Sequence, residues 1–217
     1  RVANMPVYKA VTEITSPREA VVRLGLPETS RIAASTASNI LMMPKQEQWI
    51  DAAPKVWHQH WHHPIMSSFG ARHLAETLAP SLAGQAFVGG LFLNVGKIHL
   101  FSLLCHLKEI GEMDDKIKEE VQERACFELE SAFGSELIRH WQLPDFFLPT
   151  FEMLSVRRLP KDAPYRLGHI LRIAIGLNAV RGRLRLFPEQ ISWISNSIEA
   201  MEVGKEPLRA TLKEMQT

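Results

Sequence analysis

The 217-residue sequence has little of what several protein classes require. Its two cysteines, Cys105 and Cys126, lack a Cys-x-x-Cys spacing, which indicates free thiols in a reducing compartment. No G-x-S-x-G motif occurs, and Gly89-Gly90 lacks the G-K-[ST] ending of a phosphate-binding loop, so neither nucleophilic catalysis nor a P-loop has support. The formal net charge of +1 predicts neither a nucleic-acid binder nor a partner with an acidic surface.

Targeting signals and repeats are also missing from the sequence. We find no signal peptide, lipidation motif, internal repeat or low-complexity segment, and we expect a cytoplasmic location. The first residue is Arg1 rather than Met, so we expect the chain to be part of a longer protein. A hydrophobic content of 46% is enough for the core of one domain.

One long apolar stretch, Gln85 to Leu107, stands at the centre of the chain. Polar residues such as Asn94 and Lys97 interrupt it, which argues against a membrane span of roughly 20 apolar residues. Apolar residues recur in it at helical spacing, and Gly96 is placed to stop the first helix. We therefore predict two buried helices that meet at a turn.

The remaining patterns are also helical and predict an all-α fold. A helix should begin at Ser16-Pro17 and end at Gly25, and others should cover 28–43, 46–79, 109–136, 168–186 and a last one from Pro188. We expect Lys205 to Thr217 to form a charged tail. The residues predicted to face inward in 109–136 are Ile117, Val121, Cys126 and Leu129. Those in the last helix are Ile191, Ile194, Ile198 and Met201.

The turn in the apolar stretch has the spacing of a known motif. Its sequence GLFLNVGK, Gly90 to Lys97, resembles the G-L-L-H-D-I-G-K corner of the HD superfamily of metal-dependent phosphohydrolases. The adjacent His and Asp ligands of that corner correspond here to Leu93 and Asn94. Leucine offers no donor to a metal, and a lone Asn carbonyl is a weak, uncharged one.

A second resemblance covers more of the chain. The segment Phe127 to Pro144 is similar to an element of the HD-related output domain (HDOD) family, with Gly134, Leu137, Trp141, Leu143 and Pro144 in register. The opening of the chain, through Ala3-Asn4 and Ile14 to Gly25, is similar to the entry of the same family. The resemblance implies an HD-like helical bundle, with 1–15 left from an N-terminal helical layer, 16–186 as the HDOD domain and 187–217 as a C-terminal helix and tail.

The same resemblance locates the positions that bind metal in the HD superfamily. They fall on His63, Leu93, Asn94, Glu130, Leu154 and Ser155, and only His63 keeps its ligand type. We therefore expect no catalytic residue, no resident metal and no cofactor. The resemblance implies a bacterial signalling or regulatory module that binds protein partners or other signalling domains. We expect no membrane association and do not favour nucleic acid as a partner.

Three alternatives stay open at this point. A phosphohydrolase could use substitute ligands such as His63, Asn94, Glu130 and a nearby His. The basic stretch Arg157–Arg185 could bind phosphate groups, with Arg181 and Arg185 on one helix side, or it could be a solvated face. His58 and His62, one helical turn apart, could chelate a metal or simply pack among aromatic rings.

Overall fold

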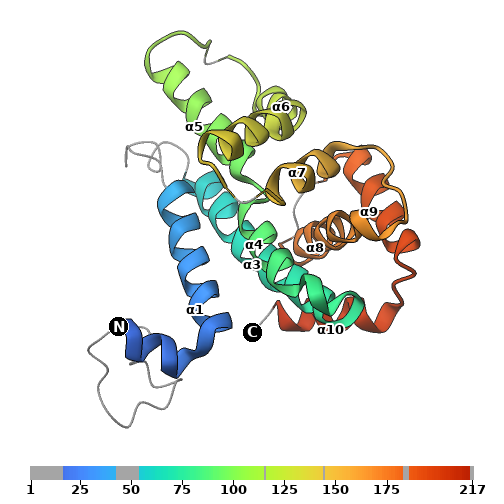
Figure 1. Ribbon diagram of the computed structural model, residues 1–217. Helices are drawn as coiled ribbons and strands as arrows, with labels where there is room; N and C mark the ends of the chain where they lie inside the picture. The colour runs from blue at the N-terminus through green and yellow to red at the C-terminus, as the bar shows by residue number, and fades with distance from the viewer. Residues whose placement is uncertain (1–16, 43–53, 115, 144, 183–185, 216–217) are drawn as a thin grey trace. The chain divides into compact units, whose positions relative to one another are not determined.

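The computed structural model describes residues 17–42, 54–114, 116–143, 145–182 and 186–215. Every regular element in these ranges is helical, which confirms the predicted all-α class (Figure 1). The elements are α1 (Pro17–Met42), α3 (Pro54–Leu78), the 3₁₀ turn η3 (Pro80–Leu82), α4 (Ala83–Phe92), α5 (Val95–Glu109), α6 (Glu119–His140), α7 (Phe147–Ser155), the 3₁₀ turn η4 (Ala163–Tyr165), α8 (Arg166–Gly182), α9 (Pro188–Ala200) and α10 (Lys205–Glu214).

The chain divides into two compact units, Arg1–Leu41 and Met42–Thr217. In the first unit α1 begins at Pro17 as predicted, while the expected Ser16 cap lies outside the described residues. Gly25 has a φ of 75°, which breaks the helical geometry there before the helix resumes. The predicted stop at Gly25 and the predicted second helix from residue 28 correspond to the two parts of α1 on either side of this break. The predicted division of the chain at residues 15 and 186 stays a prediction.

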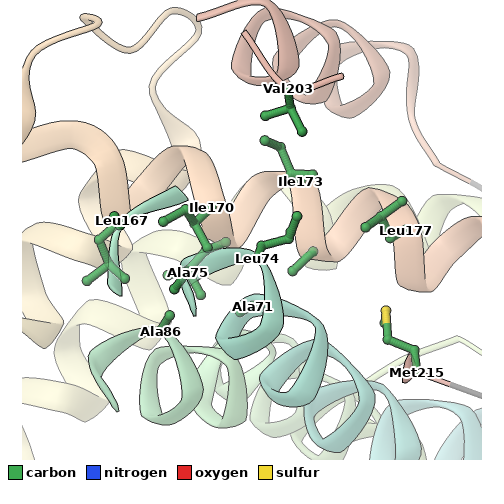
Figure 2. Packing of buried hydrophobic residues seen from close by; sticks show 13 residues of the cluster. Ala71, Leu74, Ala75, Ala86, Leu167, Ile170, Ile173, Leu177, Val203 and Met215 are labelled. Carbon is green, nitrogen blue, oxygen red and sulfur yellow. The ribbon is translucent and has the colours of Figure 1, made fainter. Parts of the chain in front are cut away.

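The core of the second unit lies where α3 and α4 meet α8 (Figure 2). Small and branched side chains alternate at this contact, so the helices approach closely and bury their apolar faces. The C-terminal end of the chain completes the core with Val203 and Met215. The buried members are Ala71, Leu74, Ala75, Ala79, Ala86, Leu167, Ile170, Leu171, Ile173, Ala174, Leu177, Val203 and Met215.

The segment predicted to be a charged tail is the helix α10, so that prediction was wrong. α10 packs against α3 and α8. Few of its residues are apolar, and its buried contribution comes from Thr211 and the following Met215. Leu208, Leu212 and Met215 recur at helical spacing and pack on the core, so the sequence did contain an apolar stripe, but the prediction followed the charged residues between them.

The glycine at the α4–α5 turn does not stop a helix, contrary to the prediction. The turn is made by Leu93 and Asn94, and Gly96 lies in the first turn of α5. A Cβ atom at Gly96 would overlap the carbonyl oxygen of Glu130 and come within 2.9 Å of the backbone nitrogen of Gly134. Gly96 is therefore the position at which α5 and α6 touch backbone to backbone.

The buried face of α6 differs from the predicted one. Cys126 is buried as expected, but Val121 and Leu129 are 57% and 53% exposed, and Ile117, before the helix, is also exposed. The true inward residues begin at Phe127 and continue through Gly134 to Ile138. In α9, Ile194, Ile198 and the following Met201 are partly buried, whereas Ile191 is exposed and was wrongly placed.

The apolar stretch behaves as a pair of core helices. By length and composition alone the continuous segment Pro80–Glu109 is apolar enough to cross a membrane. The polar residues Asn94 and Lys97 within it argue against a membrane span. The core helices of soluble proteins satisfy the same criterion. In this fold 56% of its most apolar window is buried against other helices.

Candidate functional site

Four of the six predicted ligand positions line one pocket. The α4–α5 turn supplies Leu93, α6 supplies Glu130, and the end of α7 supplies Leu154 and Ser155. The pocket has a volume of about 50 Å³. Its full lining is Leu93, Phe127, Glu130, Ser131, Phe151, Leu154, Ser155 and Trp193. The motif register therefore identified residues that are far apart in the sequence and adjacent in space.

The other two predicted positions are not among the lining residues. Asn94 precedes the first residue of α5 and makes no side-chain capping hydrogen bond. His63 lies on α3, where the side-chain amide of Asn178 donates to its backbone carbonyl at 2.9 Å. Burial, assisted by the nearby cations Lys97 and Arg181, lowers the pKa of His63 to about 4. The imidazole is therefore neutral at pH 7 and lies outside the pocket.

Glu130 is the one ionisable group among the described residues that line the pocket. Burial raises the pKa of its carboxyl to about 7, and Lys97 only partly opposes this shift. Glu130 forms no hydrogen bond or ion pair with any other described residue. Exposed acids on the same helix are paired, Glu128 with Arg124 and Glu136 with Arg139. Glu130, which is less exposed than these two acids, thus has no such partner among the described residues.

Aromatic rings form much of the wall, and the sequence analysis did not place them there. Trp193 of α9 stacks on Phe127 of α6 with ring centroids 5.8 Å apart. Phe151 of α7 is 2% exposed, and its ring lies against Gly134. These rings come from three helices, and only the aromatic residue types themselves could have indicated their role.

Arg172 of α8 supports the wall from behind. It is 2% exposed and donates hydrogen bonds from Nη2 to the carbonyl oxygens of Met153 and Leu154, at 2.6 and 3.2 Å, and to that of Val156. These carbonyl groups lie at the C-terminal end of α7, where they lack intrahelical donors, and a cation there satisfies them. Its guanidinium carbon lies 5.5 Å from the centroid of the Trp193 ring, and burial lowers the pKa of Arg172 to about 10.

The described residues that line the pocket do not offer the donors that a divalent metal needs. Leu93, Leu154 and the aromatic rings offer no ligand atoms, Ser155 offers a neutral hydroxyl, and Glu130 offers one carboxyl. Within the described ranges, no group of three or more His, Cys, Asp or Glu side chains is arranged to hold a metal ion. The side chains of His58 and His62 lie outside what the structure describes, so their proposed chelate stays a hypothesis.

The basic stretch does not form one continuous surface. Arg181 is exposed and lies near His63, whereas Arg172 is buried and donates hydrogen bonds to the carbonyl groups at the end of α7. Arg185 lies outside the described residues. The phosphate-binding reading of Arg181 and Arg185 therefore stays a hypothesis.

The two cysteines are free thiols. Cys126 is buried and Cys105 is partly buried. Burial raises the pKa of both thiols, which disfavours the nucleophilic thiolate.

Comparison with known proteins gives two matches. A family model described as HDOD domain matches residues 1–153. The solved structure named "Putative metal-dependent phosphohydrolase from Shewanella amazonensis SB2B" has the same fold, with a TM-score of 0.63 and 16% sequence identity, and the alignment covers 99% of this chain and 76% of that one. No curated protein matches this chain.

Proposed function

The chain belongs to the HDOD domain family, and from this premise we propose that it is a non-catalytic regulatory module of bacterial signal transduction that acts by binding protein partners. Its location is then the cytoplasm, where such signalling partners are found. Fold alone does not carry this proposal, because one scaffold can serve several functions. The composition of the pocket carries it.

The observation that supports a non-catalytic role is the exchange of donors for apolar groups at the ligand positions. Two leucines and a serine stand where the HD superfamily has metal-binding side chains, and three aromatic rings complete the wall. Metal-dependent hydrolysis needs several charged or imidazole donors converging on the ion to polarise phosphate and activate water. Glu130 alone cannot supply them.

The surface around the pocket is suited to protein contacts. Val121 and Leu129 of α6 and Ile191 of α9 expose apolar side chains to solvent. Between these helices Arg124 pairs with Glu189 at 3.0 Å and lies over the Phe127 ring. Exposed aliphatic groups beside arginine and aromatic residues are typical of interface composition.

The proposal is tested by metal content and hydrolysis together. The purified chain should contain no stoichiometric Mn, Fe, Mg or Zn, and it should not hydrolyse p-nitrophenyl phosphate or bis-p-nitrophenyl phosphate with any of these ions added. Metal-dependent turnover that disappears in Glu130→Gln would refute it.

A matched gain-of-function variant shows that the assay can detect a metal site in this pocket. Leu93→His, Leu154→His and Ser155→His introduce three imidazoles at positions that line one pocket with Glu130. Three imidazoles and one carboxylate match the donor sets of transition-metal sites. The triple variant should acquire one bound Zn or Mn per chain while the natural sequence acquires none.

A further inference from the structure

The unpaired carboxyl of Glu130 is the feature that the proposed function leaves unexplained. A buried carboxylate without a hydrogen bond or counter-ion is costly, and proteins rarely retain one without a use. A glutamine would fit the same space without that cost. The pocket therefore contains a carboxyl that becomes charged above a pKa of about 7 and has no partner for that charge among the described residues.

The described cations nearest to this carboxyl form no ion pair with it. Lys97 of α5 is close enough to act on Glu130 electrostatically but forms no ion pair with it within the described residues. Arg172 of α8 uses its Nη2 on the carbonyls that end α7 and its guanidinium face on Trp193. With both cations present, the pKa of Glu130 is still raised to about 7.

The remaining walls fit an alkyl chain that carries a compact charge. Leucine side chains and aromatic rings provide apolar contact, and the hydroxyls of Ser131 and Ser155, 3.1 Å apart, offer lone pairs near the carboxyl. A lysine-like side chain has this form, since its stem is apolar and its head is a small donor of three hydrogen bonds. The ring faces of Phe127 and Trp193 already contact Arg124 and Arg172, so Glu130 is the anchor for the head.

The size of the pocket sets the ligand class. A volume of about 50 Å³ is several times the roughly 10–15 Å³ that one water needs by the same measure, and it is too small for a nucleotide. From this geometry we infer that the pocket binds a protonated primary alkylamine, with its ammonium group on Glu130 and its stem between Leu93, Leu154 and Phe151. The amine is either a lysine side chain of a partner protein, a source that rests on the proposed function, or a free small amine.

The ligand is tested with n-butylammonium chloride on the full chain, in the presence of a chelator at pH 8 and constant ionic strength. The readout is the indole N–H resonance of Trp193, which Trp193→Phe identifies. Butylammonium should shift it saturably, and n-butanol, which has the same stem without the charge, should not. Equal shifts with both compounds would overturn the inference.

Two variants and a pH change test the role of the carboxyl. Glu130→Gln should abolish the shift, while Glu128→Gln should retain it, because Glu128 lies on the same helix and pairs with Arg124 at the surface. With a pKa of about 7 for Glu130, the natural chain should bind about tenfold more weakly at pH 6 than at pH 8. Unchanged affinity in Glu130→Gln, or at pH 6 in the natural chain, contradicts the inference without relying on whether a variant folds.

A second probe separates the two sources of the amine. Nα-acetyl-lysine N-methylamide carries the same ammonium and stem on a peptide backbone. If it binds as well as butylammonium, the pocket accepts a partner's lysine; if only butylammonium binds, the ligand is a free amine. Because the titration contains a chelator and no phosphate ester, its outcome is independent of the hydrolysis test of the proposed function.

Discussion

Glu130 and His63 show how burial acts in opposite directions on an acid and a base. Burial raises the pKa of Glu130 to about 7, so its carboxyl is neutral below that pH. Burial lowers the pKa of His63 to about 4, so its imidazole is neutral above that pH. In both cases the low-polarity surroundings disfavour the charged form. Lys97 lies near both groups and lowers both pKa values, since a cation favours carboxylate and disfavours imidazolium.

Glu130→Gln should stabilise the protein at pH 8 and leave its stability unchanged at pH 4. Between 4.5 and about 7 the unfolded chain loses the Glu130 proton while the folded chain keeps it, so folding stability falls as the pH rises. The difference corresponds to on the order of 3 kcal/mol in the free energy of unfolding at pH 8. Urea unfolding at the two pH values measures it, and Glu128→Gln serves as the exposed control.

The histidine adds a second, opposite dependence to the same experiment. As the pH falls from 6.5 towards 4, the unfolded chain protonates His63 and the folded chain does not, so stability is lost on acidification. The two effects offset each other between about pH 4.5 and 6.5 in the natural chain. Glu130→Gln should therefore show a loss of stability on acidification in this window that the natural chain lacks, and a parallel response of the two would contradict the assignment.

At the residue scale the motif register predicted positions but not surroundings. Leu93, Glu130, Leu154 and Ser155 line one pocket, because fixed offsets in a helical motif fix which side chains converge, while their role as former ligand positions stays a prediction. Trp193 was not included, since it comes from α9 after the matched region. Arg172 was assigned to a basic surface because arginine is usually exposed, although its neighbours Leu171 and Ile173 are apolar and all three residues are buried.

At the scale of elements, glycine contacts decide how the helices pack. Gly96→Ala should lower the free energy of unfolding by roughly 2–3 kcal/mol, because its new methyl group meets the backbone of Glu130 and Gly134, which cannot move aside like a side chain. Chemical unfolding monitored by circular dichroism measures the loss. Gly84→Ala in α4 is the matched control, because no atom lies within 4 Å of its Cβ position. That substitution should stabilise by up to about 1 kcal/mol through helix propensity, and equal effects of the two substitutions would contradict the packing role.

The periodicity of the sequence predicted where the helices lie, but it did not predict which side of each helix is buried. The start at Pro17 and the helices around the apolar stretch were predicted, because capping residues and Pro positions act locally. The inward face of α6 was misjudged because Val121 and Leu129 suggest one stripe while Phe127, Gly134 and Ile138 form another. A sequence holding two apolar stripes does not say which of them the tertiary structure buries.

At the scale of the molecule, the family match predicted the fold better than its function. The HDOD family model matches residues 1–153, and the HD-like fold extends through the remaining helices. Leu93, Leu154 and Ser155 supply no charged or imidazole donor to a metal ion. They do not indicate what the pocket holds instead, since that depends on how Glu130 is buried and left unpaired, a three-dimensional property that no sequence pattern encodes.

The C-terminal helix tests whether the second unit is one cooperative body. Met215 follows α10, is 2% exposed and contacts Gly70 of α3, where a Cβ atom would come within 2.7 Å of the Met215 sulfur. Met215→Ala removes this contact and leaves a cavity between two segments that are far apart in the sequence. We expect a loss of roughly 2–4 kcal/mol in the free energy of unfolding.

Met215→Leu, which nearly preserves side-chain volume, should lose less than about 1.5 kcal/mol. Deleting 202–217 removes Val203 and Met215 from the core together, so the thermal transition should fall further than in Met215→Ala while α3 and α8 melt in a single step. An unchanged melting temperature in the deletion would mean that this segment is an appendage. A lowered one would mean that the core, from Ala71 of α3 to Met215 at the end of α10, depends on both ends of the second unit.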